Sequence, residues 1–202
     1  MSAWFTSMLA AAATVSNFAP ASTPISQRYP GVSETSFIAD NGERTMRLAI
    51  DVPASPRQVW RVFSTADGWK MLSVKTAYVD FREGGVIETS YRAGSPKGDP
   101  DNIKNQIIAL VPDRLVVFRN VQAPRDFKDA ALFARVTTTV SLEPLGRARS
   151  RVTISGDGYG PGADFQALYG KFLTGNAYTL VGLRDALAKA RTSGATSSTG
   201  GH

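Results

Sequence analysis

The longest amphipathic pattern in the chain lies near its C-terminus and predicts a helix over residues 163–189. Apolar side chains recur there at steps of three and four, which places them on one face of a helix. This stripe consists of Phe165, Leu168, Tyr169, Phe172, Leu180, Leu183 and Leu187, with Asn176 in its middle. Charged residues such as Lys171 and Arg184 lie off the stripe, so we expect one helix face to meet water and the other to cover a large apolar surface.

Asn176 interrupts this stripe and leaves two interpretations open. In the first, the helix simply covers the core and Asn176 bonds to a neighbouring backbone group. In the second, the helix closes a cavity and Asn176 turns toward a ligand. Gly170, Gly175 and Gly182 each weaken the helix by about 1 kcal/mol relative to alanine, so tertiary packing must hold it in either case.

The preceding part of the chain predicts one strand, two short helices and then six strands. Residues 45–52 alternate between apolar and polar side chains, as a strand with one buried face does. Ser55 and Pro56 then start a helix as N-cap and first helical residue, which ends near Ser64 and is followed by a short helical piece over 67–72. Period-two patterns predict strands at 74–81, 86–92, 103–111, 115–121, 135–142 and 149–155.

Turn residues join these strands into antiparallel hairpins. Residues 82–85, 112–113 and 144–146 carry the Gly, Pro and Asp that tight turns favour, whereas 93–102 and 123–132 are long loops. The expected fold class is therefore α+β: a curved seven-stranded antiparallel sheet wrapped around a long C-terminal helix. A strongly curved sheet covered by one helix and two short ones leaves space between them, so we also expect an internal cavity.

The N-terminal region, residues 1–42, reads as a possible signal peptide and a flexible segment. Residues 1–27 carry no charged side chain, and an apolar run at 8–15 precedes Ala19-Pro20-Ala21, a small-x-small pattern that signal peptidases favour. The usual basic start is missing, and the run is too short to span a bilayer. Export to the periplasm or medium with cleavage near Ala21 and a disordered cytoplasmic N-terminus both remain open.

The remainder divides into a domain over residues 43–191 and a Ser/Thr/Gly-rich tail over 192–202 that we expect to be disordered. The chain contains no cysteine, and its only histidine is His202. This composition excludes disulfides, thiolate sites and every nucleophilic scheme that needs a histidine in the domain. The net charge is +6, but the one tight basic cluster, Arg147, Arg149 and Arg151, reads as a solvated edge rather than a nucleic-acid surface.

Four segments, in this order, resemble the START-related helix-grip superfamily, also called SRPBCC. They are residues 52–60, residues 79–85, residues 107–115 and the terminal helix. The likeness covers roughly residues 45–190 and is strongest to the branch named after the activator of the heat-shock chaperone ATPase. Residues 119–124 and 168–177 resemble a bacterial subgroup. The resemblance implies the helix-grip fold, whereas the superfamily includes lipid carriers, hormone receptors, polyketide cyclases and chaperone regulators.

Eight side chains are candidates for ligand contacts inside the expected cavity. They are aromatic or neutral polar residues at positions that we expect to face inward: Trp69, Tyr91, Phe118, Asn120, Thr138, Tyr169, Phe172 and Asn176. Strand alternation puts Phe118 and Asn120 on one face and Arg119 on the other. Each aromatic side chain can equally belong to an ordinary core, so the prediction rests on the whole set.

The sequence predicts no catalytic residue, metal site or cofactor. No pair of carboxylates falls on an inward face, and Glu88 is expected to pair with an exposed basic residue across its strand. Tyr91 and Tyr169 could donate hydrogen bonds to a carbonyl, but a phenol of ordinary pKa is a poor base at neutral pH. Asp99 and Asp101 offer two oxygen ligands where calcium needs about six or more.

Three functions follow as hypotheses, and the first is preferred. The cavity binds a hydrophobic or aromatic small molecule and is gated by the two long loops and the terminal helix. Alternatively, the same cavity belongs to a cyclase- or hydrolase-like enzyme, which only the superfamily suggests. Third, the domain is a chaperone-regulating or other interaction module, which export would exclude because that chaperone is cytosolic. We expect no nucleic-acid partner and no stable membrane span, and the oligomeric state stays open.

Overall fold

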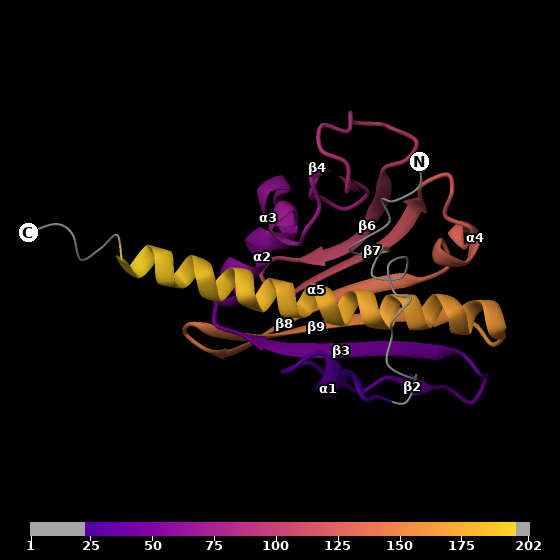
Figure 1. Ribbon diagram of the computed structural model, residues 1–202, viewed down its shortest axis with the longest axis horizontal. Coiled ribbons are helices and arrows are strands. Elements are labelled where there is room, and N and C mark those ends of the chain that lie inside the picture. The colour runs from indigo at the N-terminus through magenta and orange to yellow at the C-terminus, as the bar shows by residue number, and fades with distance from the viewer. Residues whose placement is uncertain (1–22, 197–202) are drawn as a thin grey trace, which may run out of the picture.

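One long helix lies across the concave face of a curved antiparallel sheet in the computed structural model, which describes residues 23–196 (Figure 1). The main strands are β3 (Arg44–Val52), β4 (Thr76–Val79), β5 (Val86–Ser90), β6 (Ile103–Val111), β7 (Leu115–Gln122), β8 (Thr137–Gly146) and β9 (Arg149–Tyr159). The helices are α1 (Ile25–Arg28), α2 (Pro56–Ser64), α3 (Ala66–Met71), α4 (Ala130–Phe133) and α5 (Ala163–Thr196). The α+β class, the seven strands and the terminal helix are thus confirmed.

The sheet also contains two short strands that the sequence did not predict. They are β1 (Ser33–Glu34) and β2 (Phe37–Ile38), which both pair with β3. The sheet order is β1-β3-β9-β8-β7-β6-β5-β4, with β2 beside β3 off this path. Residues 23–42 therefore differ from the flexible segment expected there, because part of their backbone extends the sheet. The proposed signal peptide and cleavage point, residues 1–21, lie outside the described residues.

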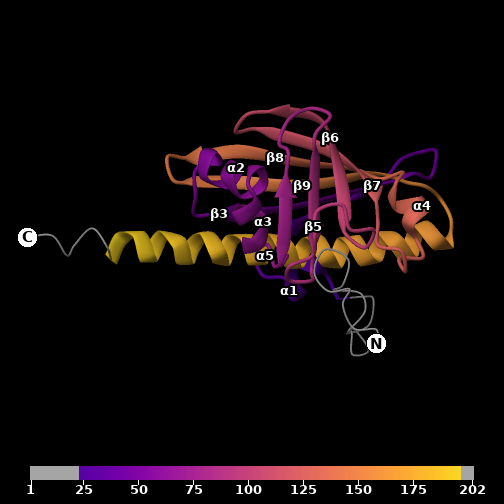
Figure 2. The ribbon, with the colours of Figure 1, turned by 90° about the horizontal axis from the view of Figure 1, so that it is seen from above.

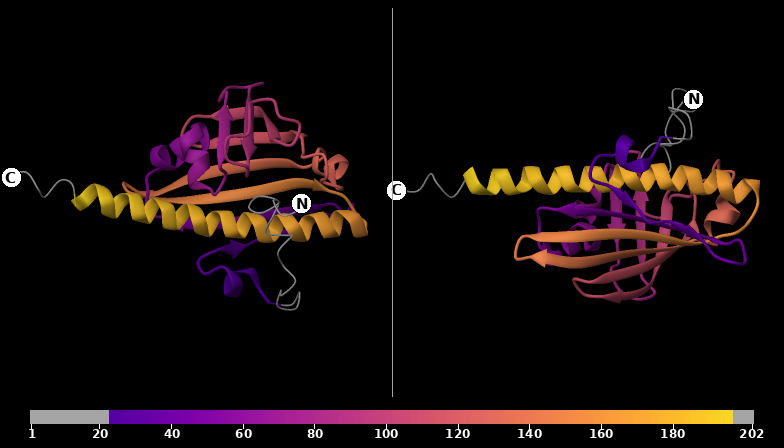
Figure 3. Two further views of the ribbon diagram at one scale, coloured as in Figure 1. Left: turned by 45° about the horizontal axis from the view of Figure 1, so that its top comes forward. Right: turned by 90° about the horizontal axis from the view of Figure 1, so that it is seen from below.

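Helix α5 contacts β3 and β9 and buries the stripe that its sequence predicts. Figures 2 and 3 show it running along the sheet, with its C-terminal end beyond the strands. It continues to Thr196 rather than ending near Lys189, so residues 192–196 are helical where a disordered tail was expected. Within residues 23–196, no helix combines the length and apolarity that crossing a bilayer requires.

The short helices begin where the sequence signals place them. The Ser55 hydroxyl accepts a hydrogen bond from the Gln58 amide at 3.4 Å, and Gln58 Oε1 accepts one from the Ser55 amide at 2.9 Å. This reciprocal capping box satisfies two amides that a helix start otherwise leaves unpaired, and Pro56 follows at the first helical position. Helices α2 and α3 then close one end of the concave face, so α2 can contribute to a cavity wall.

One predicted turn is wrong. The strand β8 continues through residues 144–146, which were expected to form a turn, and the chain reverses between Gly146 and Arg149. Pro144 is tolerated because it lies beyond the last residue of β8 that pairs with β7, at an irregularity of the β8–β9 ladder. Gly146 has a φ of +140°, a backbone conformation that favours glycine.

Candidate functional site

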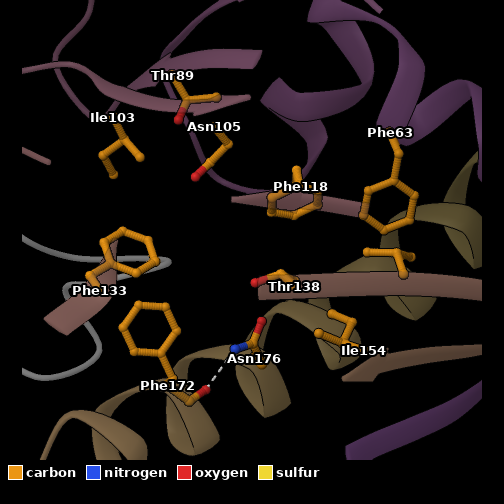
Figure 4. Close-up of a pocket in the computed structure, with 11 residues that line it drawn as sticks. Phe63, Thr89, Ile103, Asn105, Phe118, Phe133, Thr138, Ile154, Phe172 and Asn176 are labelled. Carbon is orange, nitrogen blue, oxygen red and sulfur yellow. Dashed lines mark hydrogen bonds between the residues drawn. The ribbon is translucent and has the colours of Figure 1, made fainter. Parts of the chain in front are cut away.

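A cavity of about 30 Å³ lies between the concave face of the sheet and α5 (Figure 4). We call it the main cavity. Its apolar wall consists of Phe63, Ile103, Phe118, Phe133, Val140, Ile154 and Phe172. Four neutral polar residues complete it: Thr89, Asn105, Thr138 and Asn176. Because none of these eleven side chains titrates, the wall offers shape, apolar surface and neutral hydrogen-bonding groups.

Regular secondary structure positions these side chains. Strand alternation points Ile103 and Asn105 of β6 to the same side, and the same period brings Thr138 and Val140 of β8 together. The four-residue step from Phe172 to Asn176 keeps both on one face of α5. Eight different elements therefore hold the wall, and Phe133 reaches it from the short helix α4.

Asn176 both bonds to a neighbouring backbone group and faces the main cavity, so each of the two interpretations of this residue holds in part. Its Nδ2 donates to the Phe172 carbonyl at 2.9 Å and lies 3.8 Å from Met46 Sδ. The Nδ2 bond fixes the amide orientation, so Oδ1 points the other way, into the main cavity (Figure 4). This oxygen has no hydrogen-bond partner among the described residues. The side chain thus bonds to its own helix and presents an acceptor to the cavity.

Four of the eight predicted site residues line the main cavity: Phe118, Thr138, Phe172 and Asn176. Asn120 is buried on the same face as Phe118, as predicted, but does not line the cavity. Its Nδ2 donates to the carbonyls of Lys104 at 3.1 Å and Gln122 at 3.0 Å, and to Oδ1 of Asn105 at 3.3 Å. Asn120 therefore supports the wall from behind, through Asn105.

Trp69 and Tyr91 lie away from the main cavity. Trp69 is buried, its Nε1 donates to the Phe63 carbonyl at 2.7 Å, and its ring lies edge-on to that of Phe63. It supports a wall residue but is not one itself. Tyr91 is partly buried and packs against the edge of the hydrophobic core.

Tyr169 lines a second pocket, of about 80 Å³, near the start of α5. The Arg44 guanidinium lies 4.5 Å from the centre of its ring, and its hydroxyl donates to Glu34 Oε1 at 3.3 Å. Burial raises the pKa of this phenol, as it does for neighbouring Tyr159. Both groups are therefore protonated at neutral pH, which makes them poor bases. The Tyr159 ring contacts both Tyr169 and Phe172, so it stands between the second pocket and the main cavity.

Sequence reasoning missed seven wall residues: Phe63, Thr89, Ile103, Asn105, Phe133, Val140 and Ile154. A signal existed for Thr89 and Asn105, because each is a polar residue at the inward position of a strand whose inward neighbours are apolar. Phe133 had no such signal, since it lies in the short helix α4 within the long connection between β7 and β8. Its position depends on how that connection folds back onto α5.

The loop over residues 123–136, which we call the lid, covers one end of the main cavity. The Phe133 ring lies 4.7 Å from that of Phe172 and 6.0 Å from that of Phe127. Lys171 Nζ on α5 donates to Asp129 Oδ2 at 2.6 Å. Aromatic contacts and one ion pair therefore fasten the lid to the helix.

The loop between β5 and β6 is organised by Glu88, contrary to the expected exposed ion pair. Glu88 is buried, and its Oε1 accepts hydrogen bonds from the Gly98 amide at 2.6 Å and Asn102 Nδ2 at 2.7 Å. The alternation rule failed because this loop folds back over the outer face of β5. The Arg125 guanidinium also makes a bidentate contact with Asp101, at 2.8 Å to each oxygen, which joins this loop to the lid.

This loop–lid contact predicts an acid-sensitive contribution to stability. Mainly the hydrogen bond from Arg125 lowers the pKa of Asp101 from 3.8 to about 2. A depressed folded-state pKa gives stability that is present above pH 3.8 and is lost as the pH falls toward 2. We expect Asp101→Asn to flatten the pH dependence of the free energy of unfolding in this window, measured by urea unfolding. Asp126→Asn, which removes a lid carboxylate that forms no ion pair among the described residues, is the control; equal slopes for both variants would contradict the prediction.

The comparisons with known proteins agree with this architecture. The family model for polyketide cyclases, dehydrases and lipid transport matches residues 43–191. No curated protein matches the chain in sequence. Among solved structures, the Aha1 dimer from Colwellia psychrerythraea aligns with a TM-score of 0.55 and 19% identity, over 71% of this chain and 95% of that one.

Two further structures share the fold. The ZhuI aromatase/cyclase from Streptomyces sp. R1128 has a TM-score of 0.55 and 14% identity, over 75% of this chain and 98% of its own. Protein Ms6760 from Mycobacterium smegmatis has a TM-score of 0.54 and 16% identity, over 79% of this chain and 99% of its own. At these identities the structures establish the helix-grip fold alone.

Proposed function

This chain belongs to the polyketide cyclase/dehydrase and lipid transport family, and from that premise we propose that its main cavity binds a hydrophobic or aromatic small molecule. The observation that carries the proposal is the wall itself: seven apolar and four neutral polar side chains converge between the sheet and α5. Ligand sites in proteins commonly have this composition. Family membership also confirms the superfamily that the sequence resembles.

The size of the main cavity adds a condition to the proposal. A volume of about 30 Å³ holds about two water molecules, so an aromatic ligand enters only if a wall moves. The lid is the part of the wall with the least regular structure, and Phe133 is the lid residue that lines the main cavity. We therefore assign entry to outward movement of the lid, with Phe133 leaving Phe172.

Binding is favoured over acid–base catalysis because the lining side chains do not titrate. A cyclase-like role would have to rest on orientation of the substrate by Thr89, Asn105, Thr138 and Asn176 alone. A chaperone-regulating role has no feature of the main cavity in its favour. We accordingly keep the cyclase-like enzyme as the second candidate, and turnover of a bound polyketide would be its test.

Filling the cavity tests the binding function. Ile154→Phe adds volume to the wall, whereas Ile108→Phe adds the same volume on β6 at an exposed position. We expect the first variant to lose affinity for bound aromatic probes by at least about tenfold while keeping its circular dichroism spectrum, since overpacking costs about 1–3 kcal/mol. The second variant should bind like the parent. Equal binding by both variants, or no probe bound by the parent in native mass spectrometry, would contradict the proposal.

The ion pair on the lid gives a kinetic prediction. Lys171→Met removes the contact with Asp129, and a partly exposed pair of this kind contributes about 0.2–1 kcal/mol. If the lid must open, probe association should become about 1.4- to fivefold faster, as measured by stopped-flow fluorescence. Lys128→Met, which removes an exposed lysine of the same lid, is the control. Unchanged association in Lys171→Met would count against entry through the lid.

A further inference from the structure

Several side-chain oxygen atoms face the main cavity. Asn176 presents Oδ1, because its Nδ2 already donates to the Phe172 carbonyl at 2.9 Å. Figure 4 shows the oxygen atoms of Asn105, Thr138 and Asn176 directed into the space between the Phe118, Phe133 and Phe172 rings. These three oxygens come from β6, β8 and α5, so they approach that space from different sides of the wall.

Two of these oxygens can only accept hydrogen bonds. A carboxamide oxygen has no proton, and the Asn105 oxygen is oriented by Asn120 Nδ2 at 3.3 Å. The Thr138 hydroxyl can donate or accept, and no described residue bonds to it. Asn176 Oδ1 is therefore an acceptor that no described residue satisfies, and its complement is a ligand group that donates.

The absence of charged side chains from the eleven lining residues further restricts the ligands that fit the main cavity. A carboxylate or phosphate in this space would meet amide oxygens and aromatic faces, with no lining cation to balance it. Burial of an uncompensated charge is strongly unfavourable. An ammonium ion would donate hydrogen bonds, but the wall holds no carboxylate to compensate it.

We infer that the ligand of the main cavity is an uncharged apolar molecule carrying a hydroxyl or N–H group, which donates to Asn176 Oδ1. The inference rests on the proposed binding function and names the chemistry that the site selects. Asn176 is its specificity-determining residue, and Phe133 and Phe172 hold the apolar body of the ligand. Ethers of the same shape and organic anions are discriminated against.

Three probes of one ring system test this selection in the intact protein by isothermal titration calorimetry at neutral pH. They are 2-naphthol, 2-methoxynaphthalene and 2-naphthoate. We expect 2-naphthol to bind about tenfold more tightly than 2-methoxynaphthalene, the effect of one hydrogen bond to a buried acceptor, and 2-naphthoate to bind most weakly. In Asn176→Leu the advantage of the naphthol should fall below about twofold.

The matched control is Thr179→Val on the same helix. Its hydroxyl is buried and donates to the Gly175 carbonyl at 2.9 Å, and it does not line the main cavity. It should leave the ranking of the probes unchanged. If 2-methoxynaphthalene or 2-naphthoate binds the parent protein as tightly as 2-naphthol, the inference is wrong although the binding function stands. If no probe binds, the proposed function itself is overturned; the parent ranking decides even if Asn176→Leu does not fold.

Discussion

Trp69→Ala is expected to lower the free energy of unfolding by about 3–5 kcal/mol, as truncation of a buried aromatic side chain does. Trp69 is 1% exposed, its ring lies 6.0 Å from that of Phe63, and its Nε1 bonds to the Phe63 carbonyl. The alanine would leave a large void at the end of α2 and an unpaired buried carbonyl. The loss of stability is measured by chemical unfolding followed by far-ultraviolet circular dichroism, a signal that does not depend on the tryptophan removed.

The phenylalanine variant separates packing from ligand binding at this position. Trp69→Phe keeps most of the ring volume and should cost about 1–3 kcal/mol, mainly through the unsatisfied Phe63 carbonyl. Because Trp69 lies behind the wall, probe affinity of the folded variant should remain within about twofold of the parent. A large loss of affinity in a stable Trp69→Phe protein would instead place Trp69 in the binding site, as the sequence suggested.

Gly68→Ala is expected to have the second large effect, about 3 kcal/mol of lost stability, the upper end of ordinary overpacking costs. A Cβ on Gly68 would lie 2.3 Å from the Val62 carbonyl oxygen and 2.4 Å from Val62 Cα. These are backbone atoms of α2, so relief requires that α2 and α3 separate. A drop in the thermal midpoint measures the effect.

Glycine-to-alanine substitution at Gly170 and Gly182 provides a control, because there we expect it to raise stability rather than lower it. Both lie within α5, and an added Cβ would meet no atom within 4 Å at either position. Gly170→Ala and Gly182→Ala should each raise the free energy of unfolding by up to about 1 kcal/mol, because alanine loses less backbone entropy in a helix. If Gly68→Ala behaved like these two, the close contact between α2 and α3 would not constrain residue 68.

The fold could be predicted from sequence because its signals are local and periodic. Ser55 with Pro56 fixes the start of α2, and alternation fixes the inward faces of the long strands. The short strands β1 and β2 could not be found in this way. A two-residue strand shows no period, and its existence depends on the edge that β3 offers.

The candidate site could be predicted only in part. Periodicity shows on which face of a helix or strand a side chain lies, but not which pocket that side chain reaches. Tyr169 and Phe172 belong to one stripe of α5, yet three residues of helix separate them by about 4.5 Å along the axis. This distance and the intervening Tyr159 ring place them at different pockets. In the same way Asn120 shares a face with Phe118 but lies behind Asn105. The lid residue Phe133 depends on the path of a loop, which no local pattern encodes.

The pairing of β1 and β2 with β3 has a consequence for how this protein tolerates trimming. The family match begins at residue 43, so a fragment cut at that boundary would lose both strands and bare the backbone amides and carbonyls of β3 along one side. An open strand of this kind is a template for another molecule. The segment before residue 43 thus protects β3 from pairing with a second molecule, and a chain that begins at residue 43 should self-associate more readily.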